Sequence, residues 1–156
     1  HIASGVMVVN LDADDKSDGA ANGNHGWLYA TNGQKRNAGS SSNYGDAYTQ
    51  NDIIGVALDM DNKAINFSKN GTFQASGDPT SGASKTNAAY TNLAGTITVQ
   101  VYDGQGSESH EFSMNFGSPH HAVSSGNSDA NGHGNFEYAV PSGYFALCTK
   151  NLAEFG

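Results

Sequence analysis

The chain of 156 residues has a formal net charge of −8 at pH 7, and 37% of its residues are hydrophobic. Its seven Lys and Arg side chains are scattered, so we expect neither nucleic acid nor anionic lipid as a partner, and no apolar run is long enough for membrane insertion. The length suits one domain over residues 1–156, and seven Tyr, seven Phe and one Trp argue against disorder.

The N-terminal third predicts short strands separated by polar loops. Residues 2–11 carry apolar side chains on both alternating faces, which is typical of a strand that is covered on both sides. A short strand is predicted at Trp27–Ala30, and Gln34 begins a return strand after an Asn-Gly turn. Residues 12–26 and 37–45 are rich in Gly, Ser and Asn and are predicted to be loops.

The clearest element is a β-hairpin between residues 52 and 71. Residues 53–60 alternate with period two and present one apolar face, which indicates a strand. Asp61-Asn62-Lys63 is a polar break of hairpin length, and residues 65–68 resume the alternation. Asn70-Gly71 then follows, and both residues tolerate positive φ, so a second tight turn is expected.

The remaining chain alternates strand patterns with long polar loops. Further strands are predicted at 93–103, 112–116, 136–140 and 143–148. Residues 73–92 and 118–135, together with the earlier loop 12–26, are long enough to be candidates for function. Because the strands are short and no long helical pattern occurs, the sequence predicts an all-β antiparallel sandwich.

Several motifs occur in an order that resembles one known family. Residues DIIGVALDMD followed by INFSKNG resemble the central signature of SPRY domains, with Gly26-Trp27, Tyr44-Gly45, Val101-Tyr102-Asp103 and Asn115-Phe116-Gly117 in matching order. The stretch from Pro141 to Leu152 resembles SPRY domains of bacteriophage tail-fibre and other virion proteins. The resemblance implies a concanavalin-like β-sandwich that binds partners through its loops. It also implies a fragment of a longer chain, since SPRY domains usually begin with an aromatic-rich strand upstream of residues 6–11.

A cluster of carboxylates suggests one possible cofactor. Asp12, Asp14, Asp15 and Asp18 lie close together in a Gly-rich loop, and calcium prefers such oxygen ligands. The spacing begins like a calcium-binding EF-hand loop but places Lys16 at the third ligand position. Two interpretations therefore remain, a solvated acidic loop without a cofactor or a Ca²⁺ site.

Six residues are candidates for contact with a ligand. Tyr44 and Tyr48 lie in a polar stretch that indicates surface exposure, although aromatic residues of a sandwich are commonly core residues. Tyr102 and Asp103 close a strand at a turn, where both could face a ligand. His120 and His121 lie in a long loop, and adjacent side chains of an extended chain point apart, which disfavours a shared metal.

No catalytic motif is evident in the sequence. G-x-S-x-G is absent and glutamates are few, so we do not predict an enzyme. We predict a non-catalytic binding module of a phage virion protein, a tail-fibre or appendage domain that recognises a host surface glycan or protein outside the cell. By analogy with tail fibres, a homotrimer would add avidity. The alternative is a purely structural virion domain that contacts neighbouring virion subunits.

Overall fold

The computed structural model describes residues 4–12, 24–104 and 111–155. Its backbone contacts divide the chain into two compact units, residues 1–110 and residues 111–156. The sequence predicts a single domain over residues 1–156. Two compact units do not by themselves decide whether the chain is one domain or two, so this assignment stays a prediction. The described residues include no helix that is long and apolar enough to cross a membrane.

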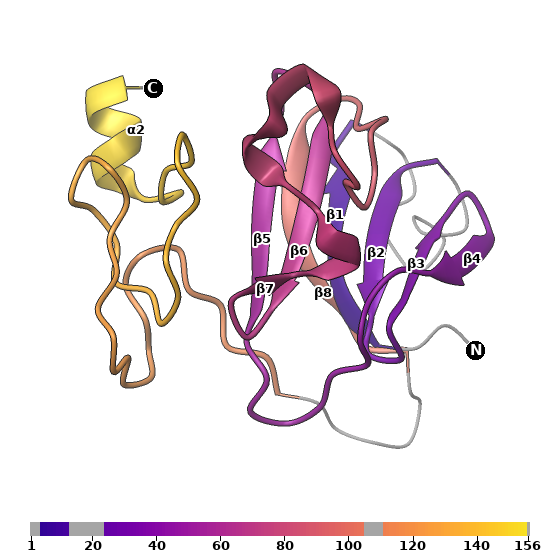
Figure 1. The fold of residues 1–156 in the computed structure, drawn as a ribbon, viewed down its shortest axis with the longest axis horizontal. Helices are drawn as coiled ribbons and strands as arrows, with labels where there is room; N and C mark the ends of the chain where they lie inside the picture. The colour runs from indigo at the N-terminus through magenta and orange to yellow at the C-terminus, as the bar shows by residue number, and fades with distance from the viewer. Residues whose placement is uncertain (1–3, 13–23, 105–110, 156) are drawn as a thin grey trace. The chain divides into compact units, whose positions relative to one another are not determined.

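The first unit contains a five-stranded antiparallel sheet (Figure 1). Its strands, in spatial order, are β4 (Ser40–Asn43), β3 (Gln34–Asn37), β2 (Gly26–Ala30), β1 (Gly5–Asn10) and β8 (Ile97–Tyr102). All five residues of β2 and the first five of β1 are buried, as expected for strands covered on both faces. Strand β4 lies inside the predicted loop 37–45; its Ser and Asn side chains are all exposed, so it shows no alternation.

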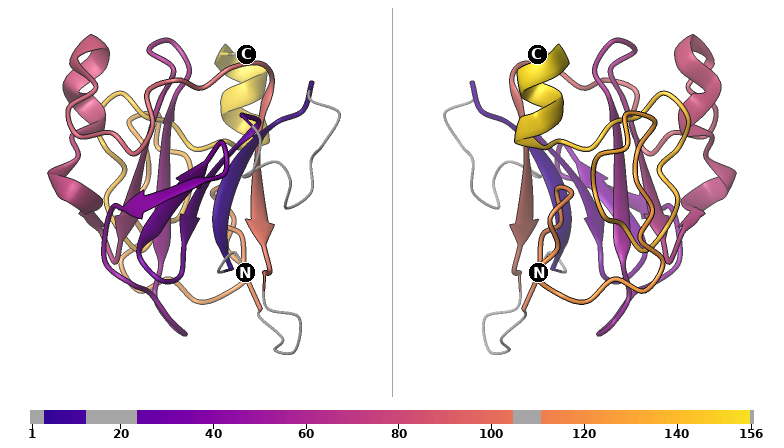
Figure 2. Two further views of the ribbon diagram at one scale, coloured as in Figure 1. Left: turned by 90° about the vertical axis from the view of Figure 1, so that its right-hand side faces the viewer. Right: turned by 90° about the vertical axis from the view of Figure 1, so that its left-hand side faces the viewer.

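A three-stranded antiparallel sheet faces the first (Figures 1 and 2). Strands β5 (Ile54–Asp59) and β6 (Ala64–Lys69) form the predicted hairpin, and β7 (Thr72–Phe73) follows. Asn70 and Gly71 have φ values of 49° and 82°, so the turn uses the left-handed conformation that these residues favour. The prediction of an antiparallel β-sandwich is therefore confirmed.

Two apolar clusters hold the first unit together. The larger cluster joins the two sheets and includes Trp27 and Tyr29 from β2 with Ile65 and Phe67 from β6. The smaller cluster lies on the opposite face of the five-stranded sheet and contains Met7, Val9, Leu28 and Ala30. Adjacent residues of β1 thus enter different clusters, which is the physical basis of its double-sided apolar pattern.

A compact segment connects β7 to β8 where the sequence predicts a long loop. It contains two short 3₁₀ helices, η1 (Gln74–Ser76) and η2 (Pro79–Ser84). The Asp78 side chain accepts a hydrogen bond from the Thr80 N–H and so caps η2. Tyr90 then makes a bridge to Ile65 of β6, which attaches the segment to the sandwich.

The second unit differs from the sequence prediction. Residues 112–116, 136–140 and 143–148 do not form strands, and among residues 111–155 the ladder pairing is limited to one bridge between Asn127 and Phe136. Helix α2 (Thr149–Phe155), which was not predicted, ends the described chain. Alternation predicts a strand only if a neighbouring strand pairs with it. Here backbone N–H groups bond within turns, as Tyr144 does to the Pro141 carbonyl, or to side chains, as Ala146 does to Asp129.

A buried carboxylate organises this second unit. Asp129 is 6% exposed and accepts hydrogen bonds from the N–H groups of Asn131, His133 and Ala146 and from the Asn151 side chain, at 2.7–2.9 Å. Burial alone would raise the pKa of Asp129, but these hydrogen bonds lower it to about 2. Asn151 belongs to α2, so the ionised carboxylate connects the helix to the preceding loops.

Candidate functional site

The connection between β4 and β5, residues 44–53, is anchored by two inward-pointing tyrosines. Tyr44 and Tyr48 are each 8% exposed and belong to the core between the sheets. The Tyr48 hydroxyl donates to the Tyr29 carbonyl (2.8 Å) and accepts from the Val6 N–H (3.2 Å). The Tyr44 hydroxyl accepts from the Phe67 N–H (3.2 Å). The prediction that both tyrosines lie on the surface is therefore wrong, because their rings fill the core beneath an otherwise polar loop.

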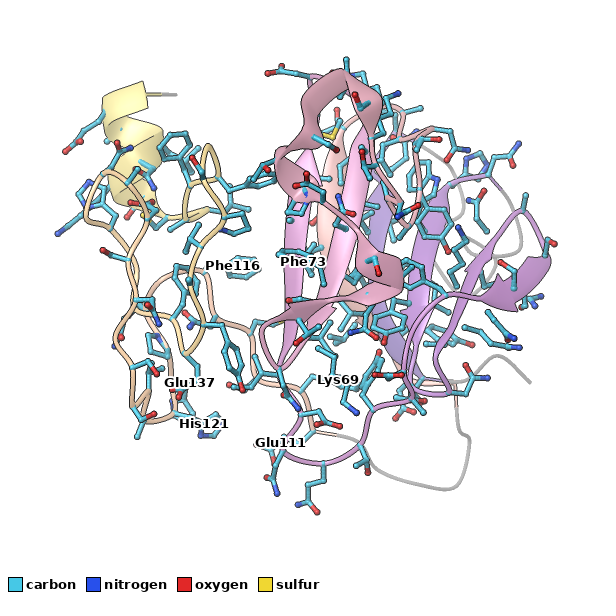
Figure 3. The ribbon with its side chains drawn as sticks, viewed as in Figure 1. Lys69, Phe73, Glu111, Phe116, His121 and Glu137 are labelled. Carbon is cyan, nitrogen blue, oxygen red and sulfur yellow. The ribbon has the colours of Figure 1, made fainter. Side chains whose placement is uncertain are left out.

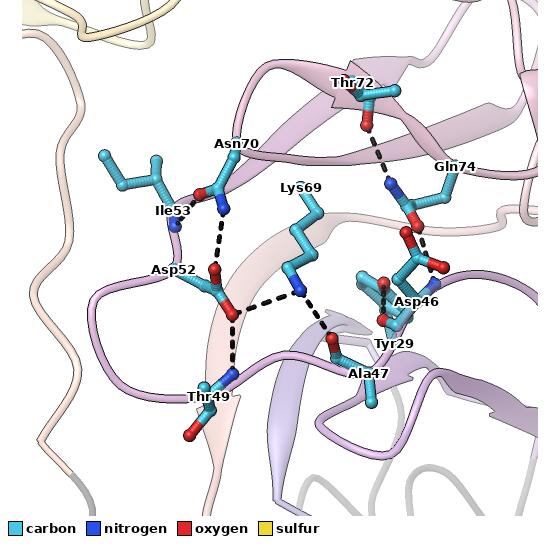
Figure 4. A network of polar contacts seen from close by, with 10 residues as sticks. All are labelled: Tyr29, Asp46, Ala47, Thr49, Asp52, Ile53, Lys69, Asn70, Thr72 and Gln74. Atoms are coloured by element: carbon cyan, nitrogen blue, oxygen red, sulfur yellow. Dashed lines mark hydrogen bonds and ion pairs between the residues drawn. The ribbon is translucent and has the colours of Figure 1, made fainter.

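Backbone atoms of the same loop are clamped at Asp46. Its N–H donates to Oε1 of Gln74 (2.7 Å), and its carbonyl accepts from the Tyr29 hydroxyl (2.6 Å). Burial raises the pKa of Tyr29 to about 12, with smaller contributions from Tyr44 and Asp46, so this hydroxyl stays protonated and remains a donor. Figure 4 shows both contacts.

A second clamp holds the far end of the 44–53 loop (Figure 4). The Asp52 carboxylate accepts from the Thr49 N–H (2.8 Å) and from the Asn70 side chain (2.7 Å), and it lies 3.3 Å from the Lys69 ammonium. Lys69 also donates to the Ala47 carbonyl (2.7 Å). These contacts lower the pKa of Asp52, the Thr49 N–H contributing most, so the clamp persists over the neutral range.

Gln74 fits against the loop only because residue 45 is glycine. A Cβ at Gly45 would lie 2.6–2.8 Å from Oε1, Cβ and Cγ of Gln74, which is closer than such atoms pack. The two residues after Gln74 are strained, since Ala75 and Ser76 have φ values of 55° and 57° without being glycine. Each such conformation costs on the order of 1 kcal/mol and is a feature that clusters at functional sites.

The loop and the strained turn together line an open hollow of about 470 Å³. Residues 43–46 form one wall and residues 72–76 the other. The lining combines polar residues with the apolar side chains of Tyr44, Phe73 and Ala75, and Phe73 lies at the end of β7 (Figure 3). Asp46 is the only ionisable carboxylate among these lining residues and is exposed.

A partly buried lysine of β3 lies against two tyrosines of the core. The Lys35 ammonium is 5.7 Å from the ring centre of Tyr44 and 5.4 Å from that of Tyr90, and it donates to the Ala89 carbonyl (2.7 Å). Burial lowers the pKa of Lys35, while the two ring faces stabilise its charged form. Its polar contacts are thus directed to the chain's own interior.

The other predicted contact residues do not line the hollow. Tyr102 packs against the smaller apolar cluster, and Asp103 accepts a hydrogen bond from the Ser4 hydroxyl (2.9 Å). His120 and His121 are exposed in the second unit, with their ring centres 5.2 Å apart in an edge-on arrangement. Whether Tyr102, Asp103, His120 or His121 contacts a ligand stays a prediction.

Most of the predicted Ca²⁺ ligands lie outside the residues that the structure describes. Asp14, Asp15 and Asp18 lie outside the described residues, and one oxygen of Asp12 accepts from the Thr96 N–H (2.9 Å). Within residues 4–12, 24–104 and 111–155, no three His, Cys, Asp or Glu side chains group as metal ligands. A Ca²⁺ site in this loop stays a prediction.

Sequence reasoning missed Asp46 and Gln74. Tyr44, Tyr48 and the predicted loop 73–92 pointed to this region, and Gly45 matters there because it admits the side chain of Gln74. Nothing in the sequence signals that a polar residue 28 positions later bonds to the loop backbone.

Comparisons with known proteins agree with the fold and place this region inside a recognised domain. The sequence model of the SPRY domain family matches residues 5–110, which includes both sheets, the 44–53 loop and the hollow. A search of curated proteins found no match. SPRY domains are protein-interaction modules and are typically non-catalytic. The chain belongs to the SPRY domain family.

Proposed function

We propose that the chain is a non-catalytic binding module of a phage virion protein, a tail-fibre or appendage domain that recognises a host surface protein or glycan. The hollow lined by residues 43–46 and 72–76 is the contact surface. A protein partner is favoured over a glycan, because protein interaction is the function of the family to which the chain belongs.

The observation that carries this proposal is the clamped 44–53 loop. Its backbone is held by Gln74, Tyr29 and Lys69, whereas Asp46, Gln50 and Asn51 are exposed. A loop that is already ordered loses little conformational entropy when it binds, so more of the contact energy appears as affinity. Exposed Asn, Ser and Gln side chains supply adaptable hydrogen bonds, as in antibody loops.

The chemistry of the hollow also supports a binding role rather than a catalytic one. Most glycosidases need two carboxyl groups facing each other, and Asp46 is the single carboxylate among the described residues that line the hollow. The clamped loop offers side chains for hydrogen bonding but no nucleophile beside a base. We therefore assign recognition, not turnover, to this surface.

Placement on a virion rests on the C-terminal stretch. Residues 141–152 resemble the end of phage SPRY domains, and a fibre would present the module outside the host cell. A homotrimeric fibre would raise the avidity of a weak single site, and Ca²⁺ bound by the loop that begins at Asp12 would rigidify a further surface.

Binding can be tested by filling the hollow. The intact chain is immobilised and screened against a random peptide library and a glycan array, and each binder is then measured by calorimetry. Asn43→Trp places an indole in the hollow, and Ser42→Trp places the same ring on the opposite face of β4. We expect Asn43→Trp, and not Ser42→Trp, to abolish binding; equal affinities for both variants would refute this surface.

A second candidate, a purely structural virion domain, is favoured by a different observation. In the second unit, six large apolar side chains are 38–60% exposed: Met114, Phe116, Tyr138, Phe145, Leu147 and Leu152. Exposed apolar side chains of this number suit permanent burial against another subunit. Changing Phe145, Leu147 and Leu152 to Ser should then abolish self-association in light scattering, while library peptides still bind; an unchanged mass would remove this candidate.

A further inference from the structure

The backbone of Asp46 makes hydrogen bonds within the fold, whereas its side chain is exposed. The N–H and the carbonyl are both engaged, with Gln74 and Tyr29 respectively. The exposed side chain takes no part in either contact (Figure 4). The backbone of Asp46 is therefore held at the rim of the hollow, while its exposed carboxylate can contact a ligand.

The two lysines close to this part of the fold, Lys69 and Lys35, already have polar partners within the chain. Lys69 pairs with Asp52 and donates to the Ala47 carbonyl, and Lys35 donates to the Ala89 carbonyl between two tyrosine rings. No Lys, Arg or His is among the residues that line the hollow. With a formal net charge of −8, the chain as a whole attracts cations.

The wall opposite Asp46 suits the stem of a long basic side chain. Phe73 lines the hollow and is half-buried, so it contributes apolar surface to that wall. Arginine and lysine pack their methylene groups on apolar surface while the charged end reaches an anion. A guanidinium can also stack on an aromatic ring and bond to a carboxylate through two N–H groups at once.

We propose that the hollow binds a basic side chain, arginine in preference to lysine, from an exposed segment of the partner protein, with Asp46 as its counter-ion. This inference rests on the proposed function and specifies the chemistry of the partner at the same surface. A neutral glycan offers hydroxyl groups but no positive charge, so it would leave the carboxylate uncompensated.

The test uses the intact chain and the random peptide library as the probe. Asp46→Asn is nearly isosteric and keeps both backbone contacts, so the fold is retained. Asp61→Asn is the matched control, because Asp61 is exposed in the turn between β5 and β6 and does not line the hollow. Peptides that bind the wild-type chain but not Asn43→Trp are taken to bind in the hollow, and only these peptides are used in the comparison.

We expect those peptides to be enriched in arginine, and then in lysine, relative to the unselected library. Asp46→Asn should weaken them by up to about fivefold, as for an exposed ion pair, and Asp61→Asn should change affinity less than about twofold. Replacing the peptide's arginine by citrulline, which keeps the shape but not the charge, should cause the same loss as Asp46→Asn. Raising the salt concentration should weaken the wild-type complex more than the Asp46→Asn complex.

The contrary results separate this inference from the proposed function. Hollow-binding peptides without basic enrichment, or insensitive to Asp46→Asn, would overturn the counter-ion role and leave a binding module. An equal loss with Asp61→Asn would reduce the effect to overall charge and also overturn it. If Asn43→Trp excluded no peptide and the glycan array alone gave binders, both the inference and the protein-binding surface would be wrong.

Discussion

Removing one hydroxyl from the core tests the inward orientation of the 44–53 loop. In the variant Tyr48→Phe the ring stays in place, but the Tyr29 carbonyl loses a donor at 2.8 Å and the Val6 N–H loses an acceptor at 3.2 Å. These contacts connect the loop to β1 and β2, and Tyr48 is only 8% exposed. Water therefore cannot readily replace the missing oxygen.

The size of the effect follows from the two lost contacts. A buried hydrogen bond contributes about 1 kcal/mol net, and a buried group left without a partner costs about 1–3 kcal/mol. We therefore expect the free energy of unfolding to fall by about 2–3 kcal/mol. For a chain of this length, each kcal/mol corresponds to roughly 3–4 °C, so Tm should drop by about 6–12 °C.

The assay is urea or thermal unfolding followed by circular dichroism, with Tyr138→Phe as the control. Tyr138 is 39% exposed, so the same chemical change there should cost less than about 0.5 kcal/mol. If both variants unfolded at the same midpoint, the Tyr48 hydroxyl would be solvated. The loop would then present this ring to solvent, as its polar composition first suggested.

Other perturbations test the remaining contacts. Burial raises the pKa of Tyr29 to about 12 and raises that of Tyr48 further, above the unfolded value near 10. Stability should therefore be complete below about pH 10 and decline as pH rises, by up to about 1.4 kcal/mol per pH unit for each tyrosine; an unchanged urea midpoint at about pH 11 would contradict this. Gly45→Ala should displace Gln74 and abolish the hydrogen-exchange protection of the Asp46 amide, and a retained slow amide would show that the clamp tolerates a methyl group. Asp129→Asn places an amide group where the carboxylate accepts four hydrogen bonds, so exchange measured by mass spectrometry should accelerate in residues 111–155 and not in residues 24–104; uniform protection would argue against its organising role.

The sequence predicted the sandwich wherever local chemistry and periodicity agreed. The hairpin of β5 and β6 combined an alternating apolar face with Asn70-Gly71, whose positive φ values the structure shows. Strand β4 escaped notice because Ser40–Asn43 is polar throughout, and such a strand is defined by pairing with β3 alone. Period-two patterns near Phe116 misled for the opposite reason, since alternation there has no paired strand among residues 111–155.

The candidate site was less predictable than the fold because it depends on the direction in which side chains point and on hydrogen bonds between residues far apart in the sequence. A tyrosine in a Ser- and Asn-rich stretch can point either way, and only the packing of Tyr44 and Tyr48 against Tyr29 and Phe67 decides the matter. The Gln74 contact to Asp46 spans 28 positions and carries no local signature. Composition therefore indicated a polar stretch around Tyr44 and Tyr48 but not the direction in which its side chains point.

The clamping of Asp46 through its main chain has an evolutionary consequence. Any residue other than proline supplies the same N–H and carbonyl, so the fold places almost no demand on which side chain stands there. Neighbouring exposed positions such as Asn43 and Gln50 are similarly free of core packing. Substitutions at these positions would change which partner is bound, while the buried tyrosines Tyr44 and Tyr48 preserve the fold of the loop.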